Sequence, residues 1–149
     1  MYKLKLTCYT PRDQAKKCSK GFAMKHFGFA SKPIETKVMS DTEFYHIWEF
    51  EKEKQMDRVI GKIPKAEQSI RQVHIILFHI IGRGNKLAKK FAWSLEKTRR
   101  WMLKRLKQKV KDPKEMEDFI NVIEINDEEE LREFLAGELF KYEILEGGI

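Results

Sequence analysis

The segment 35–51, ETKVMSDTEFYHIWEFE, limits the possible fold more than any other part of the chain. Its two halves are rich in Val, Thr, Phe, Tyr, Ile and Trp, which favour strands, and Ser40-Asp41 supplies a turn between them. Because alternate residues of a strand share a face, one face of the second half carries Phe44, His46, Trp48 and Phe50. The segment therefore predicts a β-hairpin whose apolar face packs against other elements.

The other elements follow from periodicity and from Pro and Gly signals. Pro11 opens a helix that Gly21 interrupts, and the residue before Pro113 ends a long basic helix. We predict strands over residues 2–10, 118–126 and 138–145, and helices over 11–27, 86–111 and 127–136. Acidic residues in the first turn of the last helix are favourable there, and Gly137 ends it.

Residues 64–81, PKAEQSIRQVHIILFHII, are compatible with two structures. Pro64 at a first helical position and Gly82 as a stop favour a buried helix, and the length suits one. The β-branched residues of 73–81 favour a buried strand. We prefer the helix, with GRGN, residues 82–85, as a break before the basic helix.

The order of elements predicts an α+β fold in one domain, residues 1–149. The first six elements match the split β-α-β-β-α-β (ferredoxin-like) plan of an antiparallel sheet. A helical insertion and an extra C-terminal helix–strand unit complete it. This plan hosts many unrelated functions, so it selects none of them.

Composition excludes several classes of protein. The longest nearly apolar run, residues 73–81, is too short to span a bilayer, and the N-terminus lacks the apolar core of a signal peptide. Cys8 and Cys18 form no C-x-x-C pair, and with His26 they give no recognised zinc spacing. We expect a cytoplasmic protein with reduced thiols, no membrane span, no metal and no cofactor. The 36% of charged residues resembles the composition of proteins from thermophiles.

The charge is unevenly distributed along the chain. Residues 1–111 carry 27 basic and 10 acidic side chains, a net charge of +17, and residues 112–149 carry 3 basic and 13 acidic, a net charge of −10. On a helical wheel of residues 86–111, the apolar side chains occupy nearly half the circumference and predict a core-facing side. Lysines and arginines fill the opposite side, where Glu96 is the only acid and Trp93 lies among the cations.

A solvated helix face usually mixes charges of both signs, so this cationic face needs another explanation. Lys and Arg neutralise phosphates, and an aromatic ring stacks on unpaired bases. We therefore predict a non-enzymatic nucleic-acid-binding module without catalytic residues, in which Trp93 stacks on a base. The predicted phosphate contacts are Arg83, Lys86, Lys90, Lys97, Arg100 and Lys104.

Two short motifs suggest other families. KGFAMKHF, residues 20–27, resembles the RNP1 signature of the RRM family, with Met24 in place of a stacking aromatic. If residues 73–81 form a strand, then strand–GRGNK–helix resembles the coenzyme A pyrophosphate loop of GNAT acyltransferases, at residues 82–86. That resemblance implies an enzyme as the alternative function. A third alternative is a structural or homo-oligomeric protein whose basic face pairs with an acidic surface.

Overall fold

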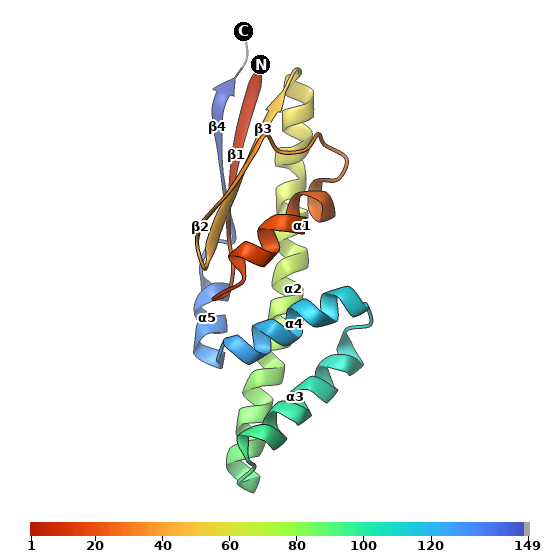
Figure 1. Cartoon of the computed structure of the whole chain (residues 1–149), viewed down its shortest axis with the longest axis vertical. Helices are drawn as coiled ribbons and strands as arrows, with labels where there is room; N and C mark the ends of the chain where they lie inside the picture. The colour runs from red at the N-terminus through yellow and green to blue at the C-terminus, as the bar shows by residue number, and fades with distance from the viewer. Residues whose placement is uncertain (148–149) are drawn as a thin grey trace. The chain divides into compact units, whose positions relative to one another are not determined.

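The computed structural model describes residues 1–147, which form an α+β fold with a four-stranded antiparallel sheet and five helices (Figure 1). The elements, in chain order, are β1 (Tyr2–Tyr9), α1 (Ala15–Phe27), β2 (Glu35–Ser40), β3 (Glu43–Phe50), α2 (Glu53–Phe91), α3 (Leu95–Lys109), α4 (Pro113–Ile125), α5 (Glu128–Ala136) and β4 (Phe140–Gly147).

The chain divides into two compact units. The sheet unit comprises Met1–Ile70 and the chain from Gly137 onward, and the helical unit is Arg71–Ala136. Helix α2 contributes its first part to the sheet unit and its last part to the helical unit. That residues 1–149 form one domain stays a prediction.

The sheet has the strand order β2-β3-β1-β4, with antiparallel pairing throughout. The predicted hairpin is confirmed as β2 and β3, in which Val38 lies opposite Phe44. The apolar face predicted for β3 is also confirmed, because Phe44, His46, Trp48 and Phe50 are all buried.

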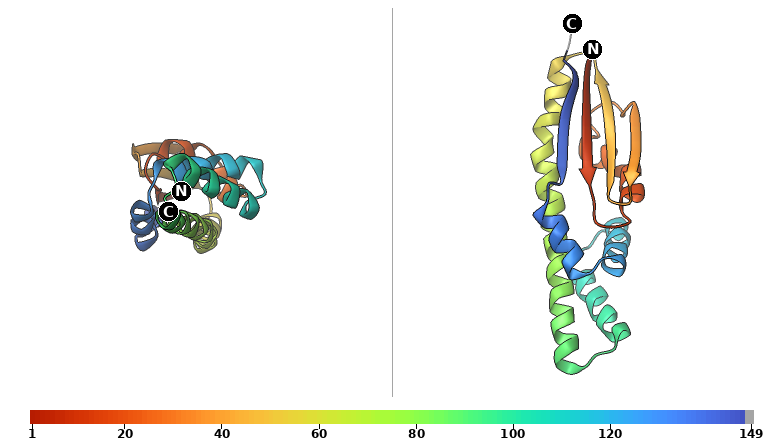
Figure 2. Two further views of the ribbon diagram at one scale, coloured as in Figure 1. Left: turned by 90° about the horizontal axis from the view of Figure 1, so that it is seen from below. Right: turned by 90° about the vertical axis from the view of Figure 1, so that its left-hand side faces the viewer.

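Helix α1 and the first part of α2 cover one face of this sheet (Figure 2). Leu4, Leu6 and Cys8 of β1 join the buried side chains of β3, and both sets pack with Phe22 and Phe27 of α1. From α2 come Met56, Val59, Ile63 and Ala66, spaced three or four residues apart on one side of the helix. Burial of this helix side against the sheet makes the core of the unit.

His46 is an unusual member of this core. Its side chain is buried, its Nδ1 lies 2.6 Å from Thr36 Oγ1, and its Nε2 has no hydrogen-bond partner among the described residues. Burial lowers the pKa of His46 from 6.5 to about 4, because the charged imidazolium is poorly solvated there. His46 is therefore neutral at pH 7.

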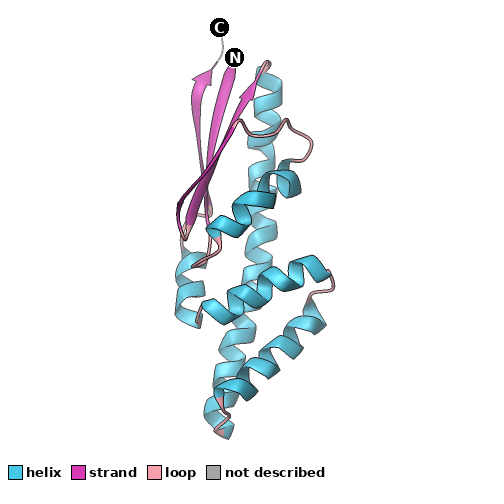
Figure 3. Cartoon of the chain, in the orientation of Figure 1, coloured by secondary structure: helices cyan, strands magenta, loops and turns pink. Residues whose placement is uncertain are grey.

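The helical unit contains the end of α2 together with α3, α4 and α5, joined by short loops (Figure 3). Leu77, Leu106 and Leu131, from α2, α3 and α5, are fully buried at its centre. The start of α5 is closed by a reciprocal cap, in which Glu130 N–H donates to Asp127 Oδ1 and Asp127 N–H donates to Glu130 Oε1. This confirms the predicted helix start.

The strand predicted over residues 118–126 is wrong, because residues 118–125 belong to α4 and Asn126 is its C-cap. Phe119, Val122 and Ile123 are buried at the three- and four-residue spacing of a helix. Asp112 caps the helix by accepting from Lys114 N–H, and Pro113 occupies a position where its missing N–H costs nothing. The fourth strand of the sheet is therefore β4, so no additional C-terminal helix–strand unit exists among the described residues.

Several predicted helix boundaries are also wrong. Residues 64–81 are helical as preferred, but α2 begins at Glu53, and Pro64 and residues 82–85 lie inside it. Pro64 is exposed, and it lacks the N–H group that would donate to the carbonyl group four residues earlier in the helix. Helix α1 begins at Ala15 rather than Pro11 and continues through Gly21, where an added Cβ would meet no atom within 4 Å.

The pKa of His46 predicts an acid-sensitive core. A histidine whose pKa is lowered by folding binds fewer protons in the folded protein than in the unfolded protein. The contribution of His46 to the free energy of unfolding is therefore complete above pH 6.5 and is lost as the pH falls towards 4. We expect His46→Phe to remove about 2–3 kcal/mol of pH dependence between these values. Urea unfolding of both proteins at several pH values measures this, and parallel pH profiles would contradict it.

Candidate nucleic-acid interface

The helix predicted over residues 86–111 is wrong as a single helix, because the chain turns at residues 92–94. Ala92 has a φ of 53°, a left-handed conformation that ends α2, and Trp93 N–H donates to Ala88 O. Ser94 then caps α3 by accepting from Lys97 N–H at 3.1 Å. The end of α2 and the whole of α3 thus form a helical hairpin.

The predicted phosphate contacts lie on both helices of this hairpin. Arg83, Lys86 and Lys90 belong to α2, at spacings of three and four residues. Lys97, Arg100 and Lys104 repeat these spacings on α3, opposite the buried Met102. All six side chains are exposed. Each helix therefore presents a line of cations with one residue per turn, and these six residues are called the basic hairpin surface below.

Within the part of the chain that the structure describes, no carboxylate forms an ion pair with this surface. Throughout residues 1–147, none of the Lys or Arg side chains between Arg83 and Lys111 forms an ion pair with an acid. Helix α5 is acidic at its start, but the Glu128 and Glu129 side chains pair with Arg132 of the same helix. The positive potential of the hairpin is therefore left open to an external anion.

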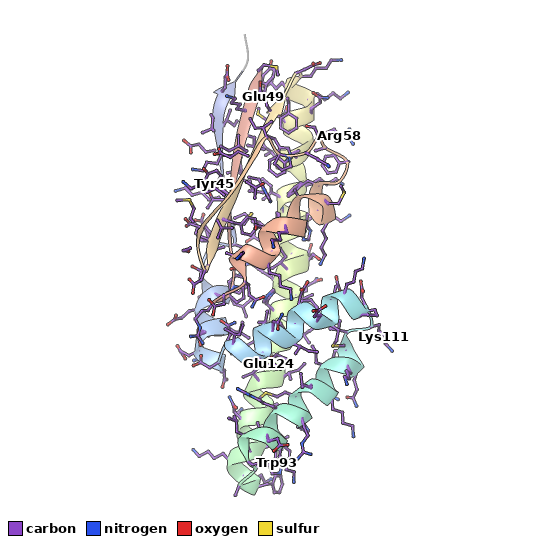
Figure 4. All side chains as sticks on the ribbon, in the orientation of Figure 1. Tyr45, Glu49, Arg58, Trp93, Lys111 and Glu124 are labelled. Carbon is purple, nitrogen blue, oxygen red and sulfur yellow. The ribbon has the colours of Figure 1, made fainter. Side chains whose placement is uncertain are left out.

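Trp93 lies in the turn of the hairpin, rather than in the middle of a helix as predicted (Figure 4). Its side chain is half-buried, and its ring centroid lies 6.1 Å from that of Phe91 and 6.5 Å from that of Trp101. Lys97 Nζ lies 5.1 Å from the Trp93 centroid, a cation–π contact. The turn thus gathers aromatic rings and cations in one place.

Two apolar residues beside Trp93 are unusually exposed. Phe91 is 57% exposed and Leu95 is 70% exposed, although both are large. Lys90 Nζ lies 5.4 Å from the centroid of the Phe91 ring. Apolar residues exposed together and surrounded by cations are typical of a binding surface rather than of a solvated turn.

Gly82 and Gly84 serve helix packing. A Cβ on Gly84 would lie 2.8 Å from Cε and 3.0 Å from Cγ of Met102, so α3 approaches α2 closely at this glycine. A Cβ on Gly82 would lie 3.0 Å from Oε1 of Glu128. Residues 82–86 are helical and follow no strand, so the N–H groups that a coenzyme A loop needs are used within α2. The acyltransferase alternative required a strand at residues 73–81 followed by a loop at 82–86, and both segments are helical.

The RNP1-like motif and the buried cysteine contribute to the core of the sheet unit. Residues 20–27 belong to α1, where Phe22 and Phe27 are buried, so the RNP1-like motif does not lie on a strand. Burial, with a smaller contribution from Cys18, raises the pKa of the Cys8 thiol well above its ordinary value. The described residues contain no group of three or more His, Cys, Asp or Glu side chains that could hold a metal ion.

Comparison with family models, with curated proteins and with solved structures finds no match to this chain. Among the described residues, no helix combines the length and the apolar character that crossing a membrane requires.

The close approach at Gly84 predicts opposite effects of two identical substitutions in α2. Gly84→Ala forces a methyl group against Met102 and should destabilise the protein by about 1–2 kcal/mol, the cost of modest overpacking. Gly61→Ala meets no atom within 4 Å and should stabilise it by about 0.5–1 kcal/mol through helix propensity. Chemical denaturation measures both, and equal stabilisation would show that the two helices do not meet at Gly84.

Proposed function

We propose that this protein is a non-enzymatic nucleic-acid-binding module that uses the basic hairpin surface. The main support is the line of exposed cations on each helix, none of them paired with a carboxylate among the described residues. Cations kept close together repel one another, so their proximity is unfavourable unless an anion binds. A polyphosphate backbone is an anion of suitable extent, and binding releases its counterions.

The aromatic turn supports unpaired rather than fully paired nucleic acid as the ligand. Phe91 and Trp93 are accessible at the end of the hairpin, and their rings lie nearly parallel, 24° apart. A base that is not in a duplex can stack on such a ring while neighbouring cations hold its phosphates. In this proposal Lys90 and Lys97 serve both roles, because each lies near a ring and also belongs to the basic hairpin surface.

We further propose the ferredoxin-like split β-α-β-β-α-β plan for the sheet unit. The strand order β2-β3-β1-β4 and the placement of α1 between β1 and β2 support it. In this plan α2 is the second helix, and α3, α4 and α5 are the insertion between it and β4. We also propose a cytoplasmic location, which is supported by the reduced thiols of Cys8 and Cys18.

Charge reversal tests the proposed surface. The triple variant Lys90→Glu, Lys97→Glu, Lys104→Glu should abolish binding to a mixed-sequence single strand without affecting folding, because all three side chains are exposed. In the unchanged protein, affinity should fall as salt is added. A plot of log affinity against log salt concentration should have a slope of about −0.7 to −0.9 for each phosphate contact. Fluorescence anisotropy measures both quantities.

A matched triple variant controls for net charge. Lys54, Lys62 and Lys65 are exposed on the first part of α2, and reversing them changes the formal charge equally. This control should retain most of the affinity. Equal losses in the two triple variants would reduce the interaction to a net-charge effect and contradict the proposed surface. Binding to anionic lipid vesicles, with none to oligonucleotides, would also contradict it.

Trp93 separates base stacking from phosphate binding. Trp93→Ala should weaken single-strand binding by about 1–3 kcal/mol, the loss of one base–aromatic stack, and leave duplex affinity nearly unchanged. Because the side chain is half-buried, we expect a stability cost of about 1–2 kcal/mol, between the values for surface and core sites. Trp93→Phe keeps an aromatic ring and should recover most of the affinity. Equal losses for single strand and duplex would exclude stacking.

A further inference from the structure

Strand β4 is an open edge of the sheet with an exposed apolar side. It pairs with β1, and on its other side it has no strand partner among the described residues. Tyr142 is 49% exposed and Ile144 is 48% exposed, although their partners Leu6 and Leu4 in β1 are fully buried. An edge with apolar side chains and unpaired backbone groups is a template for pairing with another strand.

We propose that β4 pairs with β4 of a second copy, antiparallel and about a two-fold axis through Tyr142. Charge complementarity within the strand itself supports this pairing. Lys141 and Glu143 flank Tyr142 and lie on the sheet face opposite to it, because side chains alternate along a strand. The axis places Lys141 opposite Glu143 of the second copy and Glu143 opposite its Lys141, giving two favourable cross-strand pairs.

The apolar face selects the same register. With the axis at Tyr142, the two Tyr142 side chains face each other and Phe140 lies opposite Ile144 of the second copy. Moving the axis to Lys141 or to Glu143 would place like charges directly opposite each other, which is unfavourable. A shift by one residue would place apolar side chains opposite charged ones. Of these registers, only the one centred on Tyr142 satisfies both faces.

The other edge of the sheet, β2, is less suited to pairing. Pro33 precedes it, and its pairing with β3 is irregular between Val38 and Ser40, both of which protect an edge. Glu35 and Lys37 carry the charges of β4 in the reverse order, and Val38 is 39% exposed. The residue between Glu35 and Lys37, however, is the polar Thr36, which is hydrogen-bonded to His46. The irregularity of β4 lies near its end, beyond the segment Phe140–Ile144. The edge β2 therefore provides a matched control.

A charge swap tests the pairing. The full chain should be a dimer by sedimentation equilibrium, and Lys141→Glu and Glu143→Lys should each weaken dimerisation by about tenfold or more by placing like charges opposite each other. The double variant Lys141→Glu, Glu143→Lys restores opposite charges and should recover the dimer. Lys37→Glu on β2 should have no effect. A monomeric wild-type protein, a dimer insensitive to these changes, or dissociation by the β2 variant would overturn the proposal.

Cross-linking gives a second, geometric test that does not depend on the strength of the dimer. Residues directly opposite in an antiparallel pair have Cα atoms about 4.5–5.5 Å apart, within the range of a disulfide. Tyr142→Cys in a Cys18→Ser background should form a covalent dimer on oxidation, while the native Cys8 is buried. Lys141→Cys should not, because its copies lie about two residues out of register. Equal cross-linking at both positions, or none, would overturn the register.

Discussion

The apolar side of α2 is the constraint on which both units depend. Met56, Val59, Ile63 and Ala66 bury this side in the core of the sheet unit, and Leu77, Ile80 and Gly84 bury it in the core of the helical unit. Within each of these two sets, the positions alternate between spacings of three and four residues, the period of one helix face. Gly61 and Pro64, which would weaken an isolated helix, are tolerated because both lie off this side and are exposed.

The burial of one helix side determines where the charges go. In the helical unit α3 packs through Thr98, Met102 and Leu106, so its lysines and arginines remain on the outer side. The turn at Ala92 requires a left-handed conformation that costs an alanine about 1–2 kcal/mol, and the close contact of Met102 with Gly84 helps to hold it. Packing of the hairpin thus creates a cationic surface, without an acidic partner among the described residues, and brings Phe91 and Trp93 to its end.

Local signals in the sequence predict some elements and not others. The alternation of Phe44, His46, Trp48 and Phe50 predicts the buried face of β3, because a strand period of two is hard to mistake. The Val and Ile content of residues 118–126 favours a strand, although Asp112-Pro113 is a helix start signal and Phe119, Val122 and Ile123 have helical spacing. Gly84 resembles a break in the sequence because the Met102 side chain that requires a glycine comes from another helix, α3.

The exposure of the six cations follows from their chemistry, but their arrangement does not. A lysine is rarely buried, so its exposure can be predicted without knowing the helix boundaries. The contacts of Trp93 depend on the turn between α2 and α3. The one local sequence signal for this turn is Ser94, a favourable N-cap residue, in a segment that otherwise continues a helical pattern. Burying Phe91 and Leu95 inside the unit would require the adjacent lysines to lose water without gaining partners. Exposed apolar residues at this turn are the less costly outcome, and the turn therefore keeps both the rings and the cations accessible.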